Sequence, residues 1–453
     1  MFFGKIKEKS ELISSQKKSL KIGLMGPWGY GNLGDAAIQT AMIQNLKKYL
    51  PQAEIVGFSI FPEETQKRHH IPAFAMCGVP GNTWWIENSQ SRLIYLFYKV
   101  SKTIREIQNS VVRKLFIPVR LPLEFILECF AVFRSFRIFK DFDAFIVSGG
   151  GQLDDVFEGA WQQPYALLLW AIISKLRRTK FLVVSVGAGP IQSTLSKFFF
   201  KTALSLADYR SYRDKNSKKY IEDVLRFERE KDPIFPDLAH SLDLTPYHFV
   251  SSCEKLNHKV VGLSPIPHRR PGMPPGLDSK DDGVYQNYLF QMVEIVKWLI
   301  QQKYKILFFT GQDPIDRPVI EEIKSILHEQ GVSIDDGTII ENPTTTVNQL
   351  MHEISRADWV IASRFHSILL SLLLEKPVLA LSFHDKIDSL MRRFCQSEYC
   401  LSLDSFELNQ VYEKFLQLVA CSEQVGEEIA QENHTCQNEL EAQYRLIFGT
   451  SAT

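Results

Sequence analysis

Short apolar runs alternate with amphipathic stretches along most of this 453-residue chain. Residues 20–26 form the first apolar run, and residues 36–50 follow with apolar side chains three or four positions apart, on one helical face. This alternation is typical of α/β domains, in which buried parallel strands are connected by helices that cover the sheet. We therefore expect an α/β fold whose core is built on parallel sheets.

The alternation runs twice along the chain. The runs that we expect to form strands are residues 20–26, 54–60, 143–147, 180–186, 209–212, 260–264, 305–310, 359–362 and 378–382. Residues 237–256 carry no such run and separate the two series. We expect an N-terminal extension over 1–19, a first domain over 20–250, and a second domain over 251–453 that ends in a helical tail. Two domains also suit a chain of this length.

Composition narrows the class of protein. The chain carries 52 Lys and Arg against 52 Asp and Glu, so it lacks the basic excess of a nucleic-acid binder. Its seven cysteines are irregularly spaced, which suggests reduced thiols, and no zinc-spaced ligand set indicates a metal site. The N-terminus is too polar for a secretory signal, and no run reaches the roughly 18 apolar residues of a membrane-spanning helix. The sequence favours a soluble, cytoplasmic protein.

One segment departs from the balanced charge. Residues 92–140 carry ten Lys and Arg against three Glu, a net charge of +7, interleaved with Phe, Leu, Ile and Tyr. One interpretation is a set of helices that cap the first sheet, with the basic residues on the solvated face. The other is a basic amphipathic surface that faces anionic lipid or a lipid-linked acceptor, which would bring the protein to the inner face of a membrane.

A glycine-rich turn follows the first predicted strand. Gly29, Gly31 and Gly34 match the GxGxxG fingerprint of dinucleotide binding. Asp35 argues against that ligand, because its carboxylate would lie where a pyrophosphate binds the helix N-terminus. With Asn32, these residues fit better a loop that approaches a neutral, hydroxyl-rich ligand, whose hydroxyl protons Asp35 would accept. The alternative is that Asp35 only caps the helix.

Two more glycine-rich turns end later strands of the first series. Gly149, Gly150 and Gly151 follow the run at 143–147, with Asp155 shortly after them, and Gly187 and Gly189 follow the run at 180–186. Successive glycines usually mark a close approach of the backbone by a ligand or another part of the chain. Ligands of open parallel sheets bind at the carboxyl ends of the strands. We expect these turns to meet in one substrate-binding crevice, unless they are only tight turns.

Basic side chains follow strands in both series. Arg364 and His366 lie between a predicted strand and a Leu-rich helix, where a guanidinium and free N–H groups would bind an anion and an imidazole would move a proton. Arg213 ends a strand of the first series and is a second candidate for the same anion, or pairs locally with Asp214. Lys386, after the last predicted strand, is a weaker candidate of this kind.

The chain resembles the polysaccharide pyruvyl transferase family. The resemblance rests on an ordered set of motifs over roughly residues 20–395: GPWGYGNLGDAAI, VSGGGQLDD, SVGAGPI, YRDKNSKKY and ADWVIASRFHSILLSLLLEKPVLALSFHDKIDSLM. It implies two Rossmann-like domains with parallel sheets in a GT-B-like arrangement, an acceptor domain first and a donor domain second, with the active site between them. Three positions depart from the family pattern: Ala36 replaces a usual Glu, and Ser363 and Phe365 stand where Met and Leu are commoner.

The resemblance also implies an activity. Family members transfer a pyruvyl group from phosphoenolpyruvate to sugar hydroxyls of a cell-surface polysaccharide or its lipid-linked precursor, generally forming a cyclic ketal. Arg364 and Arg213 would then bind phosphoenolpyruvate, His366 would protonate its methylene carbon, and Asp35 would activate the attacking hydroxyl. No metal or organic cofactor is needed for these steps.

Two other functions stay open from the sequence. On the same scaffold, a glycosyltransferase would use Arg364 to bind the diphosphate of a sugar nucleotide. A non-catalytic glycan-binding protein would retain the fold, although it would have no need of both Arg364 and His366. Redox chemistry with NAD is disfavoured by Asp35.

Overall fold

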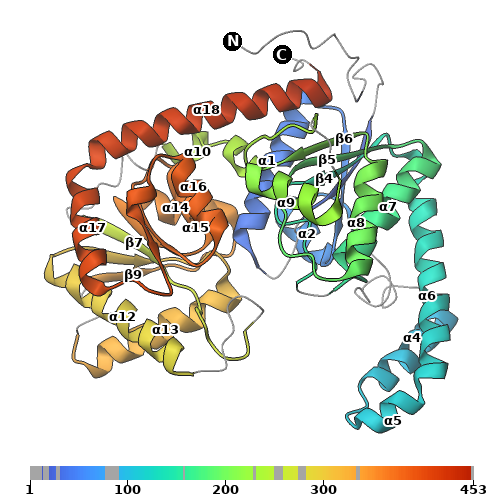
Figure 1. Cartoon of the computed structure of the whole chain (residues 1–453), viewed down its shortest axis with the longest axis horizontal. Helices are drawn as coiled ribbons and strands as arrows, with labels where there is room; N and C mark the ends of the chain where they lie inside the picture. The colour runs from blue at the N-terminus through green and yellow to red at the C-terminus, as the bar shows by residue number, and fades with distance from the viewer. Residues whose placement is uncertain are drawn as a thin grey trace. The chain divides into compact units, whose positions relative to one another are not determined.

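The computed structural model describes Ile13 and residues 20–26, 31–76, 91–156, 159–227, 231–248, 259–273, 282–332 and 337–449. The chain forms two compact units (Figure 1). The first comprises residues 1–29, 42–238 and 440–453, and the second comprises residues 30–41 and 239–439. Each unit is built on one six-stranded sheet.

The first unit contains a parallel sheet with the strand order β3-β2-β1-β4-β5-β6. Its strands are β1 (Lys21–Met25), β2 (Glu54–Ser59), β3 (Ala73–Ala75), β4 (Ala144–Ser148), β5 (Lys180–Val186) and β6 (Tyr209–Tyr212). The central strands are buried over nearly their whole length, which explains their continuous apolar runs. The predicted parallel α/β arrangement is confirmed.

Helices cover this sheet and bury an aromatic core. They are α1 (Leu33–Tyr49), which starts in the second unit, α2 (Pro62–His69), α7 (Gln163–Arg177), α8 (Thr194–Leu206) and α9 (Lys215–Leu225). Phe58, Phe139, Phe145 and Trp170 pack together, with the rings of Phe58 and Trp170 4.6 Å apart. Such aromatic contacts add specific geometry to the burial of apolar surface.

The basic segment folds into three helices of the first unit. These are α4 (Arg92–Arg105), α5 (Ser110–Leu115) and α6 (Ile117–Ile138). Ser91 and Asn109 cap α4 and α5 through their side-chain oxygens. Helix α4 packs on α6 through Tyr98, Leu127 and Ala131. Figure 1 shows α4 and α5 beside the part of α6 that lies away from the sheet.

The second unit repeats the design. Its strands are β7 (Val260–Ser264), β8 (Lys305–Phe308), β9 (Ile339–Glu341), β10 (Trp359–Ala362), β11 (Val378–Ser382) and β12 (Cys400–Ser402). All of its strand pairs are parallel, in the order β12-β11-β10-β7-β8-β9. The carboxyl ends of the strands therefore meet at one edge of the sheet, which is where ligands of such sheets bind.

The helices of the second unit follow these strands. They are α10 (Thr245–His248), α12 (Asp282–Gln301), α13 (Asp313–Glu329), α14 (Val347–Arg356), α15 (Phe365–Leu373), α16 (Asp385–Arg393), α17 (Leu408–Ala420) and α18 (Ser422–Phe448). The last turns of α18 belong to the first unit, where Tyr444 and Phe448 pack on Tyr49. None of the described helices is both long enough and apolar enough to cross a membrane.

Candidate active site

Polar side chains gather at the carboxyl edge of the second sheet. They lie in the loops or helix starts that follow β7, β8, β10, β11 and β12, namely His268, Asp313, Asp316, Arg364, His366, Lys386 and Asp404. Since parallel strands end at the same edge, residues far apart in the sequence come together here. We describe this set from its best-defined contact outward.

Arg364 and Asp316 form a bidentate ion pair. The Nε atom of Arg364 lies 2.6 Å from one carboxylate oxygen of Asp316, and its Nη2 atom donates to the other. The Asp316 side chain is fully buried, whereas that of Arg364 is 17% exposed. Fork-to-fork geometry fixes the plane of the guanidinium as well as its position.

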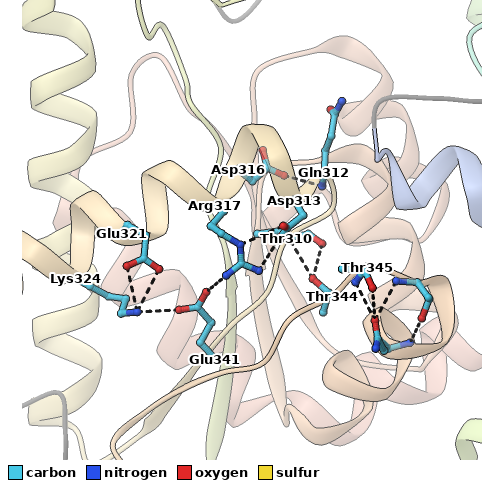
Figure 2. Close-up of polar contacts among 12 residues, drawn as sticks. Thr310, Gln312, Asp313, Asp316, Arg317, Glu321, Lys324, Glu341, Thr344 and Thr345 are labelled. Atoms are coloured by element: carbon cyan, nitrogen blue, oxygen red, sulfur yellow. Dashed lines mark hydrogen bonds and ion pairs between the residues drawn. The ribbon is translucent and has the colours of Figure 1, made fainter. Parts of the chain in front are cut away.

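A network in the first turn of α13 holds Asp316 in place (Figure 2). The Gln312 backbone N–H donates to Asp316 at 2.9 Å. Arg317 binds Asp313 and also Glu341 on β9, at 2.7 Å from the latter. Burial raises the pKa of Asp316, while Arg364 and the Gln312 amide act in the opposite direction. Asp316 is thus a rigid acceptor for the guanidinium.

The ion pair leaves part of the Arg364 guanidinium available. Arginine has five N–H donors, and the two bonds to Asp316 use Nε and Nη2. Within the part of the chain that the structure describes, Nη1 makes no hydrogen bond. The side-chain stem packs on Gly311, where an added Cβ would come within 3.0 Å of it. Arg364 can therefore present Nη1 to an anion without reorganising.

His366 lies against the start of α1, which belongs to the same unit. A Cβ added to Gly34 would come within 2.1 Å of the His366 ring, so only glycine fits beside this imidazole. The side-chain oxygen of Asn32 caps α1 by accepting from the backbone N–H groups of Gly34 and Asp35. The imidazole therefore borders a helix N-terminus, which carries positive partial charge.

The rest of the glycine turn is placed by contacts within the second unit. Gly31 has a φ of +67°, which favours glycine, and it faces Pro314. The Leu33 N–H donates to the Gly311 carbonyl oxygen at 2.9 Å. Asp35 lies half-buried in the first turn of α1, while Gly29 lies outside the described residues. Because Asn32 is the cap, Asp35 is not needed for that role.

Sequence reasoning missed a second cluster on this edge. His268 is 3% exposed, and its Nε2 atom lies 2.9 Å from Asp404. Its ring packs on Tyr288, which is close enough to Asp316 and Arg364 for both charges to act on it. Burial lowers the pKa of His268, and Asp404 opposes that effect. The only sequence signal for it is the Pro- and Arg-rich stretch PIPHRRPG that follows the first strand of the second series.

Lys386 stands at the start of α16. Its ammonium group lies 5.9 Å from the centre of the Phe365 ring, directly beside Arg364 and His366 in the sequence. A cation over an aromatic face is held by the ring quadrupole. The structure thus brings Lys386, Arg364, His366, Gly31 and the start of α1 into one unit.

Arg213 lies in the first unit at the end of β6. Its guanidinium packs on Gly187, where an added Cβ would lie 2.7 Å from Nη2. It contacts Asp214 and Asp237, each at 3.3 Å. The local pair with Asp214 that we considered from the sequence is present, and Asp237 adds a second carboxylate. Two carboxylates orient this side chain and reduce the positive charge that it offers.

The glycine turns of the first unit bond to one another. Gly149 and Gly150 have positive φ values, and the Gly187 N–H donates to the Gly150 carbonyl oxygen at 2.7 Å. The Asp155 carboxylate accepts from the backbone N–H groups of Gln192 and Ser193, at 2.8 and 2.9 Å. Both oxygens of Asp155 therefore fix the chain before α8. Gly151 adjoins Asp154.

The described residues hold no group of three or more His, Cys, Asp or Glu that could bind a metal ion. Beside the carboxylates of Asp313, Asp316 and Asp404, which pair with Arg317, Arg364 and Arg269, this edge carries a cationic guanidinium, an imidazole and an ammonium group. This set suits an anionic ligand of small size and a proton transfer beside it.

The fold as a whole is that of GT-B proteins, with two Rossmann-like domains. The UDP-GlcNAc 2-epimerase from Neisseria meningitidis bound to UDP-GlcNAc is similar, with a TM-score of 0.55 and 12% identity over 95% of this chain and 100% of that one. A putative UDP-N-acetylglucosamine 2-epimerase from Listeria monocytogenes has a TM-score of 0.55 at 12% identity, over 96% and 98% of the two chains. MurG from Acinetobacter baumannii has a TM-score of 0.51 at 12% identity, over 95% and 100%. At these identities the likeness establishes the fold alone.

A family model identifies the protein more closely. The polysaccharide pyruvyl transferase model matches residues 32–385, which is most of the chain. The chain belongs to the polysaccharide pyruvyl transferase family, as its motifs predicted. A comparison with curated proteins found no match.

Proposed function

We propose that the protein transfers a pyruvyl group from phosphoenolpyruvate to hydroxyls of a sugar in a polysaccharide or its lipid-linked precursor, forming a ketal. Family membership supports the transferred group and the acceptor class. The donor assignment rests on one observation, the Arg364–Asp316 pair. Two hydrogen bonds to Asp316 fix the Arg364 guanidinium through Nε and Nη2, which leaves Nη1 to bind an anion.

Phosphoenolpyruvate needs cationic or N–H-rich partners for its carboxylate and its phosphate. Arg364 offers Nη1 to one of them, and the N-terminus of α15 lies directly beside it, since Arg364 is the residue that precedes this helix. Lys386, at the start of α16, adds a point charge. Arg213, between Asp214 and Asp237, is the candidate for a second guanidinium.

The proposed first step is a proton transfer. His366, as the imidazolium, gives its proton to the methylene carbon, and C2 becomes electrophilic. A sugar hydroxyl bonds to C2 while Asp35 accepts the hydroxyl proton. In support of this pairing, the His366 ring lies against Gly34, and Asp35 is the next residue of α1. That proximity supports their joint action on donor and acceptor.

Phosphate then leaves C2 with the proton that Asp35 took up, and a second hydroxyl of the same sugar bonds to C2 and gives its proton back to the His366 imidazole, which closes the ketal. One molecule of inorganic phosphate is released for each pyruvyl group that is transferred. This scheme gives Asp155 no step, since its carboxylate accepts from the backbone N–H groups of Gln192 and Ser193.

A ligand comparison tests the donor. We expect phosphoenolpyruvate to raise the thermal unfolding midpoint of the purified protein, and UDP and GDP to leave it unchanged. A shift with UDP or GDP but none with phosphoenolpyruvate would support the glycosyltransferase alternative. No shift with any of the three would favour the non-catalytic alternative.

A pair of histidine variants tests the acid. His366→Gln should abolish phosphate release from phosphoenolpyruvate in the presence of acceptor glycan and leave the unfolding midpoint close to wild type. His328→Gln, at an exposed position near the end of α13, is the matched control and should keep full turnover. Wild-type turnover by His366→Gln would remove His366 from the chemistry.

A further inference from the structure

The outer surface of α4, α5 and α6, which we call the helical arm, is apolar to an extent that the fold does not explain. Between Leu115 and Phe133 every exposed residue is apolar. Leu115 is 73% exposed, Phe125 is 70% exposed and Phe133 is 60% exposed. Folded proteins rarely expose a contiguous surface of this kind unless it binds something.

The exposed apolar side chains share helix faces. On α6, Val119, Ile126, Phe130 and Phe133 recur at helical spacing on one face, next to the face that carries the packed residues Leu127 and Ala131. On α4, Leu93, Leu96 and Val100 follow the same spacing. These side chains stay exposed although α4 and α6 pack on each other. The packing of the arm therefore leaves a second apolar face on each helix.

The charge on the arm is strongly positive where it meets solvent. Within residues 92–140, all of which the structure describes, the exposed basic residues are Arg92, Lys99, Lys102, Arg113, Lys114, Arg137 and Lys140. Glu106 is the exposed acidic residue of this range. Glu124 instead pairs with Arg105 at 2.7 Å, and Glu128 accepts from Tyr165. Two of the three acidic groups of this range are thus engaged in contacts with other side chains.

We propose that the helical arm docks the protein on the surface of an anionic lipid bilayer. Exposed Phe and Leu side chains would enter the boundary between headgroups and acyl chains, while Lys and Arg would bind lipid phosphates. A second copy of the same face fits poorly, because it would bring like charges together in a low-dielectric contact. Figure 1 shows α4 and α5 at the end of the arm that lies away from the sheet of the first unit. This inference does not depend on the proposed reaction.

Vesicle co-sedimentation of the full-length protein tests the proposal. We expect binding to vesicles of phosphatidylcholine with about one third phosphatidylglycerol, weak binding to phosphatidylcholine alone, and a loss of binding as salt is raised. Equal binding to both kinds of vesicle, or to neither, would overturn the proposal.

Two variants with matched controls locate the contact. Arg113→Glu/Lys114→Glu should weaken vesicle binding by at least about tenfold, while the exposed control pair Lys47→Glu/Lys219→Glu should not. Phe125→Ser should weaken binding by about tenfold, and Phe290→Ser, at a 53% exposed position of α12, should not. These positions are exposed, so the unfolding midpoints should stay near wild type.

The variant Phe125→Ser also distinguishes docking on lipid from self-association of the protein. If the arm instead joined two copies, the wild-type mass by light scattering would double with concentration, and Phe125→Ser would return it to the monomer. Such a result, or equal binding by Phe125→Ser and Phe290→Ser, would contradict docking of the arm on lipid.

Discussion

Arg364 and Asp316 lie 48 positions apart in the sequence and meet as a bidentate pair, with Nε of the guanidinium 2.6 Å from the carboxylate. The carboxylate is fully buried, and the guanidinium retains a small exposed fraction. A buried charge that loses its partner is strongly unfavourable, so this pair links the stability of the second unit to its candidate ligand site.

Arg364→Met should lower the free energy of unfolding by about 3 to 5 kcal/mol at neutral pH, because it leaves Asp316 charged and alone. It should also abolish the thermal shift that we expect with phosphoenolpyruvate. The control is Arg210→Met, which removes a similar buried pair with Asp232 in the first unit. Urea unfolding should show a comparable loss for both variants, whereas the ligand shift should persist only for Arg210→Met.

The same variant should show a distinctive pH dependence. Burial raises the pKa of Asp316, and removal of Arg364 takes away a cause that lowers it. Asp316 of the variant therefore keeps its proton to a higher pH than Asp316 of the wild type, and the deficit in stability relative to wild type grows as pH rises through the range between these two folded-state pKa values. Urea unfolding of Arg364→Met should therefore approach wild type in acid. A deficit that is constant with pH would contradict a buried, ionised Asp316.

Gly34→Ala should displace the His366 imidazole, since the added Cβ would lie 2.1 Å from the ring. We expect a loss of about 1 to 3 kcal/mol in the free energy of unfolding, from overpacking. Turnover should fall by about 100-fold, because the acid moves from its position. Gly426→Ala on α18 is the control: its Cβ meets nothing within 4 Å, and it should leave turnover intact. Full turnover by Gly34→Ala would show that the reaction does not need the His366 imidazole at this position.

His268→Gln should flatten the pH dependence of stability below about pH 6.5, the ordinary pKa of histidine. Burial lowers the pKa of His268 in the folded protein. The unfolded chain therefore binds the proton first as pH falls, and the wild-type protein loses stability in that range. Glutamine can still donate to Asp404 but cannot titrate. An unchanged slope in urea unfolding between wild type and variant would show that His268 does not contribute to it.

Asp155→Asn should destabilise the protein without changing ligand binding. Burial acts to raise the pKa of Asp155, but the N–H groups of Gln192 and Ser193 lower it overall. The stability that ionised Asp155 contributes is therefore fully present above about pH 3.9, the unfolded-state pKa. It is lost in acid, as pH falls through the lower pKa of the folded protein. We expect a loss of about 1 to 3 kcal/mol near neutral pH, measured by urea unfolding. If phosphoenolpyruvate raised the thermal unfolding midpoint of Asp155→Asn less than that of the wild type, Asp155 would instead contribute to ligand binding.

The central strands could be predicted from the sequence because burial on both faces requires a continuous apolar run. Residues 180–186, 260–264, 359–362 and 378–382 form strands with the predicted bounds. The strands β3, β9 and β12 were not predicted. Each lies at a sheet edge or beside it and has three residues, and those of β9 are only partly buried, so no apolar run marks them.

The sequence by itself determined the parallel α/β class, the family and the motif that contains Arg364 and His366. Only the tertiary structure decided what these side chains contact. Asp316 and Gly34 are distant along the chain, and nothing in local periodicity indicates that one binds Arg364 or that the other borders His366. Strand and helix patterns report burial over a few neighbouring residues, whereas the pairing of a charge or the space beside an imidazole depends on which loops the folded sheet brings to one edge.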